Sequence, residues 1–218
     1  MYGTNSTDRI ERAIFAGYHS SHTSILDDMS ISTLFDQALH YATLVHAGQT
    51  RKGTTIPYIS HLLGVASIAL EYGATETEAI AALLHDAGED AGGEGRIADI
   101  RRRFGNAVAD IVEGCTDTVE NPKPAWRERK QKYIDHVASA SPSVILVSAA
   151  DKLHNARAIL SDYREIGEQI WLRFNGGKDG TLWYYRELLS AFRTSGDTPL
   201  LRELDAVVTQ LEEMAGEA

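Results

Sequence analysis

Apolar residues recur every three or four positions along most of this chain, which is the spacing of an amphipathic α-helix. Three stretches show the pattern clearly: Leu34, Ala38, Tyr41, Ala42 and Val45; then Leu62, Val65, Ala66 and Ala69; then Ile80, Leu83 and Leu84. The β-rich run at 143–147 continues directly into residues that extend a helix. The sequence therefore predicts an all-α fold, a single-domain bundle of several helices.

Capping residues and glycines indicate where the predicted helices begin and end. Ser32 can cap the first helix, and Thr75 with Glu78 forms a capping box for a helix that carries His85 and Asp86. This first helix, for which Ser30 is the other cap candidate, is expected to extend to about Ala47, and the next is expected to begin at Pro57 and end at Gly73. Further helices are expected at 97–104, 107–115, 125–138, 142–160, 164–174, 180–192 and 200–214, with loops at 116–123 and 175–177.

The length of 218 residues suits one domain with a sizeable core and is too short for two large ones. We expect residues 30–218 to form this domain. Residues 1–29 differ from the rest of the chain and are interpreted as an N-terminal extension with a short amphipathic helix at 9–15. Two histidines there, His19 and His22, are interpreted as exposed residues rather than ligands.

Charge and composition exclude several classes of function. A formal net charge of -10 argues against broad binding to a nucleic-acid backbone, which requires a clustered basic surface. No apolar run approaches the roughly 20 residues of a membrane span, and no secretory signal is visible. A single cysteine, Cys115, cannot form an intrachain disulfide. We therefore expect a cytoplasmic protein without a membrane or nucleic-acid partner, whose small anionic substrate would require a bound cation.

Two imidazoles and two carboxylates stand beside strongly apolar segments. His85 and Asp86 follow the apolar run Ala79–Leu84, and burial of such a pair is costly unless something compensates it. A metal ion would do so. His61 begins the preceding predicted helix, and Asp151 follows the apolar residues 144–150. This nitrogen and oxygen set suits manganese, iron, zinc or magnesium, and ligand type alone does not choose among them.

Glu89 and Asp90 follow His85 and Asp86 at a spacing of four residues, which is one helical turn. A carboxylate so placed can take the proton from an attacking water. Glu89 is the candidate general base, with Asp90 orienting it. The alternative is that these two carboxylates only solvate the end of a helix.

Polar residues on the Asp151 helix extend the candidate site. Asn155 lies four residues after Asp151, so that its amide can face the same cleft. His154 is interpreted as a residue that packs against the ligands or supports them.

Two basic clusters are candidates for phosphate binding. Arg51 and Lys52 stand between Gly48 and Gly53 in a loop that precedes the His61 helix, where phosphate recognition and guanidinium stacking are both feasible. The second cluster, 126–130, could hold a terminal phosphate, but a solvated helix face is the favoured interpretation.

Four motifs occur in order along the chain: Ala-Gly-Gln-Thr-Arg-Lys-Gly at 47–53, Ile-Pro-Tyr-Ile-Ser-His at 56–61, Ala-Ala-Leu-Leu-His-Asp at 81–86 followed by Glu89-Asp90, and Ala-Asp-Lys-Leu-His-Asn at 150–155. Together they resemble the hydrolase domain of the Rel/Spo alarmone enzymes, which are HD-domain phosphohydrolases. The resemblance covers about residues 30 to 192. It suggests a stand-alone small alarmone hydrolase, with no segment long enough for a synthetase domain.

This resemblance implies a role for each matching residue. The metal ligands would be His61, His85, Asp86 and Asp151, and the metal is usually manganese in this family. The catalytic residues would be Glu89 and Asp90. The substrate-binding residues would be Arg51, Lys52, Asn155 and, as a less direct match, Tyr184. The implied reaction is hydrolysis of the 3′-pyrophosphate of guanosine tetra- or pentaphosphate, which gives GDP or GTP and pyrophosphate.

The chain departs from the family pattern at three places. Leu62 replaces a usual proline, Gly88 replaces a bulkier residue, and the stretch from Arg51 to His61 is one residue longer than in many of these enzymes. Guanine or adenine preference therefore stays open. Other nucleotides, such as an adenosine 3′-pyrophosphate, a nucleoside monophosphate or NADPH, are alternative substrates. A nucleotide sensor without chemistry is a further alternative, and a homo-oligomer formed through the helices after Gly180 is left open.

Overall fold

The computed structural model describes residues 31–90, 92–118, 120 and 122–216, apart from the side chain of Asp90. The expectations for residues 1–29, including the helix at 9–15 and the two histidines, lie outside this part of the chain. The helices are α2 (Thr33–Val45), α3 (Ile59–Glu71), α4 (Glu76–Leu84), α5 (Ala87–Asp90), α6 (Gly93–Phe104), α7 (Asn106–Cys115), α8 (Trp126–Val137), α9 (Pro142–Ile166), η1 (Gly167–Arg173), α10 (Gly177–Phe192), η2 (Arg193–Ser195) and α11 (Pro199–Gly216). The all-α prediction is confirmed.

Local signals in the sequence start the helices at the predicted places. The Ser32 side chain accepts a hydrogen bond from the backbone N–H of Leu34 at 3.1 Å and caps α2. Thr75 and Glu78 form the predicted reciprocal capping box on α4. Ser141 caps α9, and Pro142 occupies its first turn, where its missing N–H costs nothing.

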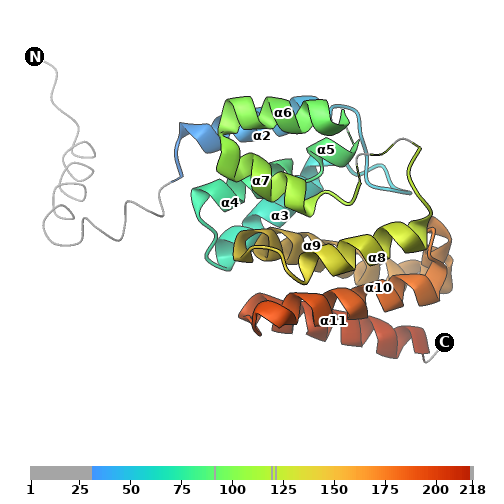
Figure 1. Cartoon of the computed structure of the whole chain (residues 1–218). Coiled ribbons are helices and arrows are strands. Elements are labelled where there is room, and N and C mark those ends of the chain that lie inside the picture. Colours follow the sequence, from blue (N-terminus) through green and yellow to red (C-terminus); the bar gives the residue numbers. More distant parts are fainter. Residues whose placement is uncertain (1–30, 91, 119, 121, 217–218) are drawn as a thin grey trace, which may run out of the picture.

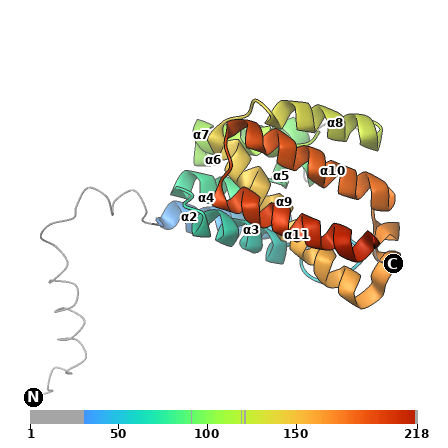
Figure 2. The ribbon, with the colours of Figure 1, turned by 90° about the horizontal axis from the view of Figure 1, so that it is seen from below.

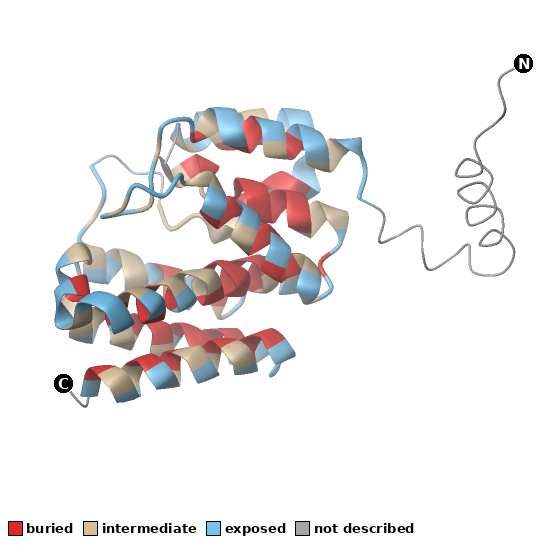
Figure 3. Cartoon of the chain, turned by 180° about the vertical axis from the view of Figure 1, so that it is seen from behind, coloured by how far each residue is buried: buried red, intermediate tan, exposed pale blue. Residues whose placement is uncertain are grey.

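The long helix α9 lies at the centre of the bundle (Figures 1 and 2). It contacts α3, α4 and α7 on one side and α10 and α11 on the other. Buried residues line the inner faces of these helices (Figure 3). Every residue of α4 from Ala79 to Leu84 is buried, because this short helix is surrounded by α2, α3, α7 and α9. The polar residues that follow α4 are therefore delivered to the centre of the molecule.

The helix that carries His85 is shorter than predicted. α4 ends at Leu84, a turn follows at His85 and Asp86, and α5 begins at Ala87. The His85 Nδ1 atom donates a hydrogen bond to the carbonyl oxygen of Ala82 at 2.8 Å, the same oxygen that a continuing helix would offer to the backbone N–H of Asp86. This competition accounts for the break.

The predictions for 142–160 and 164–174 also differ from the structure. α9 continues to Ile166, because Ile159, Leu160 and Tyr163 extend its buried face without interruption. It ends where Gly167 adopts a positive φ of 57°, a conformation that glycine accepts readily. The following residues form the 3-10 helix η1 rather than an α-helix. None of the described helices is both long and apolar enough to span a membrane.

Candidate metal centre and substrate pocket

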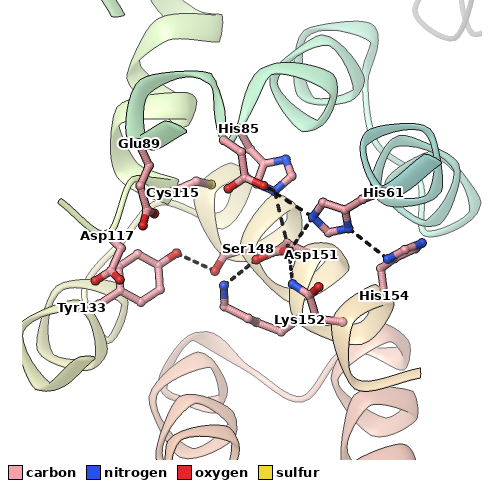
Figure 4. Close-up of polar contacts among 12 residues, drawn as sticks. His61, His85, Glu89, Cys115, Asp117, Tyr133, Ser148, Asp151, Lys152 and His154 are labelled. Carbon is pink, nitrogen blue, oxygen red and sulfur yellow. Dashed lines mark hydrogen bonds and ion pairs between the residues drawn. The ribbon is translucent and has the colours of Figure 1, made fainter. Parts of the chain in front are cut away.

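The four residues predicted as metal ligands lie together at the centre of the bundle. Figure 4 shows three of them, His61, His85 and Asp151. The Nε2 atom of His85 is 3.0 Å from Asp86 Oδ2 and 3.6 Å from Asp151 Oδ1. The Nε2 atom of His61 is 3.5 Å and 3.2 Å from the same two oxygens. Donors that share one metal ion at bonds of about 2.1 Å lie roughly 3.0 to 3.4 Å apart. All four distances lie within this range or at most 0.2 Å beyond it, as expected for donors around a single shared cation.

The two histidine Nε2 atoms are buried and have no hydrogen-bond partner among the described residues, although carboxylate oxygens lie nearby. For His85 the reason is its tautomer, because the hydrogen bond to the Ala82 carbonyl requires the proton on Nδ1. The Nε2 atom then presents a lone pair toward Asp86 and Asp151. A lone pair aimed at two carboxylates is unfavourable unless a cation lies between them.

His154 supports His61 in the same way. Their Nδ1 atoms are 2.9 Å apart, so that one ring donates to the other. Burial lowers the pKa of His154 to about 4, which leaves this ring neutral near pH 7. When His61 donates from Nδ1, its Nε2 atom keeps a lone pair that faces Asp86 and Asp151. Supporting hydrogen bonds of this kind orient histidine ligands in metal sites.

The electrostatics of the cluster favour a bound positive charge. Burial alone would raise the pKa of Asp86 and Asp151. The imidazoles of His85 and His61 outweigh burial at Asp86, and the Lys152 ammonium together with the same imidazoles outweighs it at Asp151, so that both pKa values lie well below the usual range. Burial also opposes a charge on His85, yet the two carboxylates raise the pKa of that imidazole well above its ordinary value. Two neutral imidazoles and two carboxylates would balance a divalent cation, and ligand atoms of three of these residues, His61, His85 and Asp86, lie within 4.8 Å of one another.

A cavity of about 500 Å³ opens beside this cluster. Asp86 and Asp151 line it, together with the predicted residues Arg51, Lys52, Asn155, Tyr184 and Glu89. The structure therefore brings these seven candidate residues to one pocket, and His61 and His85 contact Asp86 and Asp151 of its wall. Asp90 belongs to α5, and its side chain lies outside the described part of the structure.

A hydrogen-bonded chain links the pocket wall to the candidate ligands. The Asn155 Nδ2 atom donates to Asp151 Oδ1 at 2.5 Å, and Asn155 Oδ1 accepts from Arg51 Nη2 at 2.7 Å. Lys52 is exposed at the rim. Tyr184 is buried, and its hydroxyl has no hydrogen-bond partner among the described residues, so it is available to a molecule in the pocket.

Glu89 is held by cations rather than by the candidate ligands. Its Oε1 atom lies 2.8 Å from Lys123 Nζ and 3.7 Å from Arg129 Nη1. The prediction that it follows His85 on the same helix is wrong, because α5 is a separate helix. Glu89 nevertheless lines the cavity with Asp86, and it remains within the candidate site.

A model of the family described as HD domain matches residues 38–182, which is more than half of the chain. The chain belongs to the HD domain family. The matched residues of this HD-domain chain include all four candidate metal ligands.

The chain is also similar to curated and solved proteins. It is 40% identical over 131 residues to guanosine-3′,5′-bis(diphosphate) 3′-pyrophosphohydrolase MESH1 of Xenopus tropicalis. The aligned residues cover 59% of this chain and 70% of that protein. It is 37% identical over 136 residues to a GTP pyrophosphokinase of Streptomyces antibioticus, covering 62% of this chain but only 16% of the relative's length. A solved structure described as a metazoan ortholog of SpoT that hydrolyzes ppGpp superposes with a TM-score of 0.69 at 28% identity, covering 84% of this chain and 98% of that one.

Two cations of this HD-domain pocket were misjudged from the sequence. Arg129 and Lys130 were expected on a solvated helix face, but their side chains are 11% and 17% exposed and line the cavity. The nearly buried Asp117 carboxylate pairs with both and draws them inward. Asp117 lies in the loop before α8, so helical spacing alone could not reveal this contact.

Tyr58 and Lys152 also belong to the candidate site, although neither was predicted from the sequence. The Tyr58 hydroxyl donates to Asp86 Oδ2 at 2.6 Å, and the Lys152 ammonium pairs with Asp151. Tyr58 stands three residues before His61 in a quoted motif, and Lys152 is adjacent to Asp151. Both positions carried a signal, because a ligand carboxylate requires a supporting donor.

Gly64 provides a test of the contact between His61 and His154. A Cβ atom at Gly64 would overlap the His154 ring, so Gly64→Ala should displace that ring and break its hydrogen bond to His61. We expect metal affinity to fall by about 10- to 100-fold, the usual cost of losing such a supporting contact. Titration calorimetry with Mn²⁺ measures the dissociation constant of the metal in the variant and in the wild-type protein.

His154→Ala removes the same hydrogen bond without adding volume and should weaken metal binding to a similar extent. Gly95→Ala is the matched control, because a Cβ there meets no atom within 4 Å. Unchanged affinity in both Gly64→Ala and His154→Ala would show that His154 does not support the ligand.

Proposed function

We propose that this chain hydrolyses the 3′-pyrophosphate of guanosine 3′,5′-bis(diphosphate) and of the corresponding pentaphosphate, releasing pyrophosphate and GDP or GTP. The observation that carries the proposal is a cluster of two histidines and two aspartates that opens directly into a pocket lined by cations. The activities named for the MESH1 relatives and for the SpoT ortholog support this substrate.

In this proposal His61, His85, Asp86 and Asp151 hold a divalent cation, for which we propose Mn²⁺. Such a cation supplies Lewis acidity toward phosphoryl oxygens and lowers the pKa of water. The hydrogen bond to the Ala82 carbonyl fixes the His85 tautomer that presents Nε2 as a ligand atom, and His61 presents its Nε2 atom in the same way when its Nδ1 donates to His154. Tyr58 fixes the orientation of Asp86.

Glu89 is the proposed general base, and Asp90 is proposed to orient it. Glu89 lies in the pocket wall, where it can accept a proton from the water that attacks the 3′-phosphate. Lys123 and Arg129 hold its carboxylate in place in the pocket wall, with Lys123 Nζ 2.8 Å and Arg129 Nη1 3.7 Å from Glu89 Oε1.

The substrate is proposed to lie along the pocket between two sets of residues. Arg51, Lys52 and Asn155 contact the nucleoside side, and Tyr184 donates its hydroxyl to the substrate. The cations of α8, Arg129 and Lys130, lie where they can neutralise phosphate charge. A protein with a net charge of -10 requires such a local concentration of cations to attract a polyanion.

The remaining parts of the proposal concern the whole chain. We assign the hydrolase domain to residues 30–218 and regard residues 1–29 as an extension of it. We also propose a cytoplasmic enzyme that acts on a small nucleotide rather than on nucleic acid or a membrane.

The decisive experiment measures pyrophosphate release by the purified full chain. After chelation and readdition of Mn²⁺, we expect turnover of guanosine 3′,5′-bis(diphosphate) and none in the chelated sample. Mg²⁺, Zn²⁺ and Fe²⁺ are tested in parallel, as are adenosine 3′-pyrophosphates, nucleoside monophosphates and NADPH. Turnover of another nucleotide alone would transfer the proposal to that substrate. Tight binding without turnover under every metal would indicate a sensor.

A further inference from the structure

One carboxylate lines the substrate pocket at a distance from the candidate metal ligands. Asp162 lies on α9, the same helix as Asp151, eleven residues further on. At a rise of 1.5 Å per residue this separation is about 16 Å. Asn155 and Ile159 stand between them at helical spacing and also line the pocket. The pocket therefore extends along one face of α9 from Asp151 to Asp162.

The surroundings of Asp162 differ from those near the candidate base. Ile159 and Ile170 are 7% and 1% exposed and provide an apolar surface in the pocket wall. The Arg173 guanidinium donates to Asp162 Oδ2 at 2.5 Å. Arg173 in turn lies against Gly53, where an added Cβ would come within 3.0 Å of its side chain. An apolar wall edged by one oriented carboxylate is suited to a flat heterocycle with N–H donors.

Charge decides which part of a nucleotide can lie here. The negative charge of Asp162 offsets that of its ion-pair partner Arg173, whereas α8 supplies two cations to the pocket wall, Arg129 and Lys130, so that a phosphate is better accommodated near α8. A nucleotide bound with its 3′-phosphate beside Asp151 would therefore place its base, which is uncharged, toward Asp162. The hydrogen bond from Arg173 occupies one of the two acceptor positions of Oδ2, so that Oδ1 and the second position of Oδ2 can accept from a ligand.

We propose that Asp162 determines base specificity by accepting hydrogen bonds from the N1–H and the exocyclic 2-amino group of guanine. This inference rests on the proposed function and deepens it. Adenine presents an unprotonated N1 acceptor at the equivalent edge and carries no 2-amino group. A carboxylate facing that edge meets a lone pair and receives no compensating donor. A site built for a donor discriminates strongly against an analogue that lacks it.

The test compares kcat/KM for the 3′-pyrophosphates of guanosine, inosine and adenosine. The wild-type protein should prefer guanosine, then inosine, which keeps N1–H but lacks the 2-amino group, then adenosine. Asp162→Ala should lower kcat/KM for guanosine by about 10- to 100-fold and change adenosine little. Asp162→Asn, whose amide can also donate to adenine N1, should reduce the guanosine-to-adenosine ratio further.

Asp197→Asn is the matched control, because Asp197 is exposed, pairs with two arginines and lies outside this pocket. It should leave all three values unchanged. An equal loss on the three substrates in both Asp162 variants would reduce Asp162 to an ordinary ion-pair partner of Arg173 and overturn the proposal. Equal use of the three bases by the wild-type protein would also overturn it.

Binding without catalysis separates this proposal from the proposed function. Titration of GDP, IDP and ADP into the chelated protein should show tighter binding of GDP, and Asp162→Ala should remove the preference. If hydrolysis fails but this preference is present and depends on Asp162, the proposed reaction is wrong and the guanine contact stands. If hydrolysis succeeds but Asp162→Ala keeps the preference, only the guanine contact is wrong.

Discussion

Asp86→Asn is expected to abolish metal-supported hydrolysis while leaving the fold in place. The amide keeps the size of the carboxylate and can still accept the Tyr58 hydroxyl, but it removes one negative charge from the cluster around His61 and His85. Loss of a charged ligand should cost about 4 kcal/mol or more of transition-state stabilisation, which corresponds to about a thousandfold in kcat/KM. A continuous assay of pyrophosphate release measures this loss.

Thermal unfolding provides a second measurement for Asp86→Asn. A ligand present at 100 times its Kd stabilises the folded state by about 2.7 kcal/mol. For a chain of this size that corresponds to a rise in Tm of several degrees. We expect Mn²⁺ to raise the Tm of the wild-type protein in this way and to leave that of Asp86→Asn nearly unchanged.

The control for this substitution is Asp99→Asn. Asp99 likewise accepts a tyrosine hydroxyl, that of Tyr41 at 2.7 Å, but it lies on α6 and does not line the pocket. Full activity and a normal Mn²⁺ response are expected there. If Asp86→Asn kept the Mn²⁺-dependent activity of the wild-type protein, the proposed metal centre would be wrong.

The helices and the metal cluster were predictable because both depend on short-range patterns. The apolar period of α4 and its capping box place His85 directly after the buried residues Ala79–Leu84 of that helix. An imidazole and a carboxylate that are buried side by side require a compensating charge. A metal ion supplies it, and His61 and Asp151 then complete the predicted set of ligands. These inferences needed only neighbouring residues and the rule that buried polar groups are paired.

The features that the sequence did not reveal depend on contacts between distant segments. Arg129 and Lys130 turn inward because Asp117, on a loop, pairs with them, and Glu89 is paired with Lys123 from another part of that loop. The break before α5 depends on a side-chain hydrogen bond to one backbone carbonyl. Neither periodicity nor composition contains such information.

Glu89→Gln is expected to lower kcat by about a hundredfold to ten-thousandfold, the usual contribution of a general base. The amide cannot accept the proton of the attacking water, although it keeps the length of the side chain. Because Glu89 is not one of the four donors in the cluster, the rise in Tm with Mn²⁺ should remain that of the wild-type protein. This combination separates loss of the base from loss of the metal, which Asp86→Asn removes.

Glu128→Gln is the matched control for the ion pairs of Glu89. Glu128 also pairs with a lysine, Lys132 at 3.0 Å, but both side chains are exposed, and such a pair contributes little. Lys123→Ala addresses the other role of Glu89, as a partner of that lysine. If Glu89 acted only by holding Lys123, both substitutions would produce the same loss. A base predicts a much larger fall in kcat for Glu89→Gln, because Lys123→Ala leaves the carboxylate that accepts the proton. If Glu89→Gln kept the kcat of the wild-type protein, Glu89 would not be the general base, and another group would accept the proton of the attacking water.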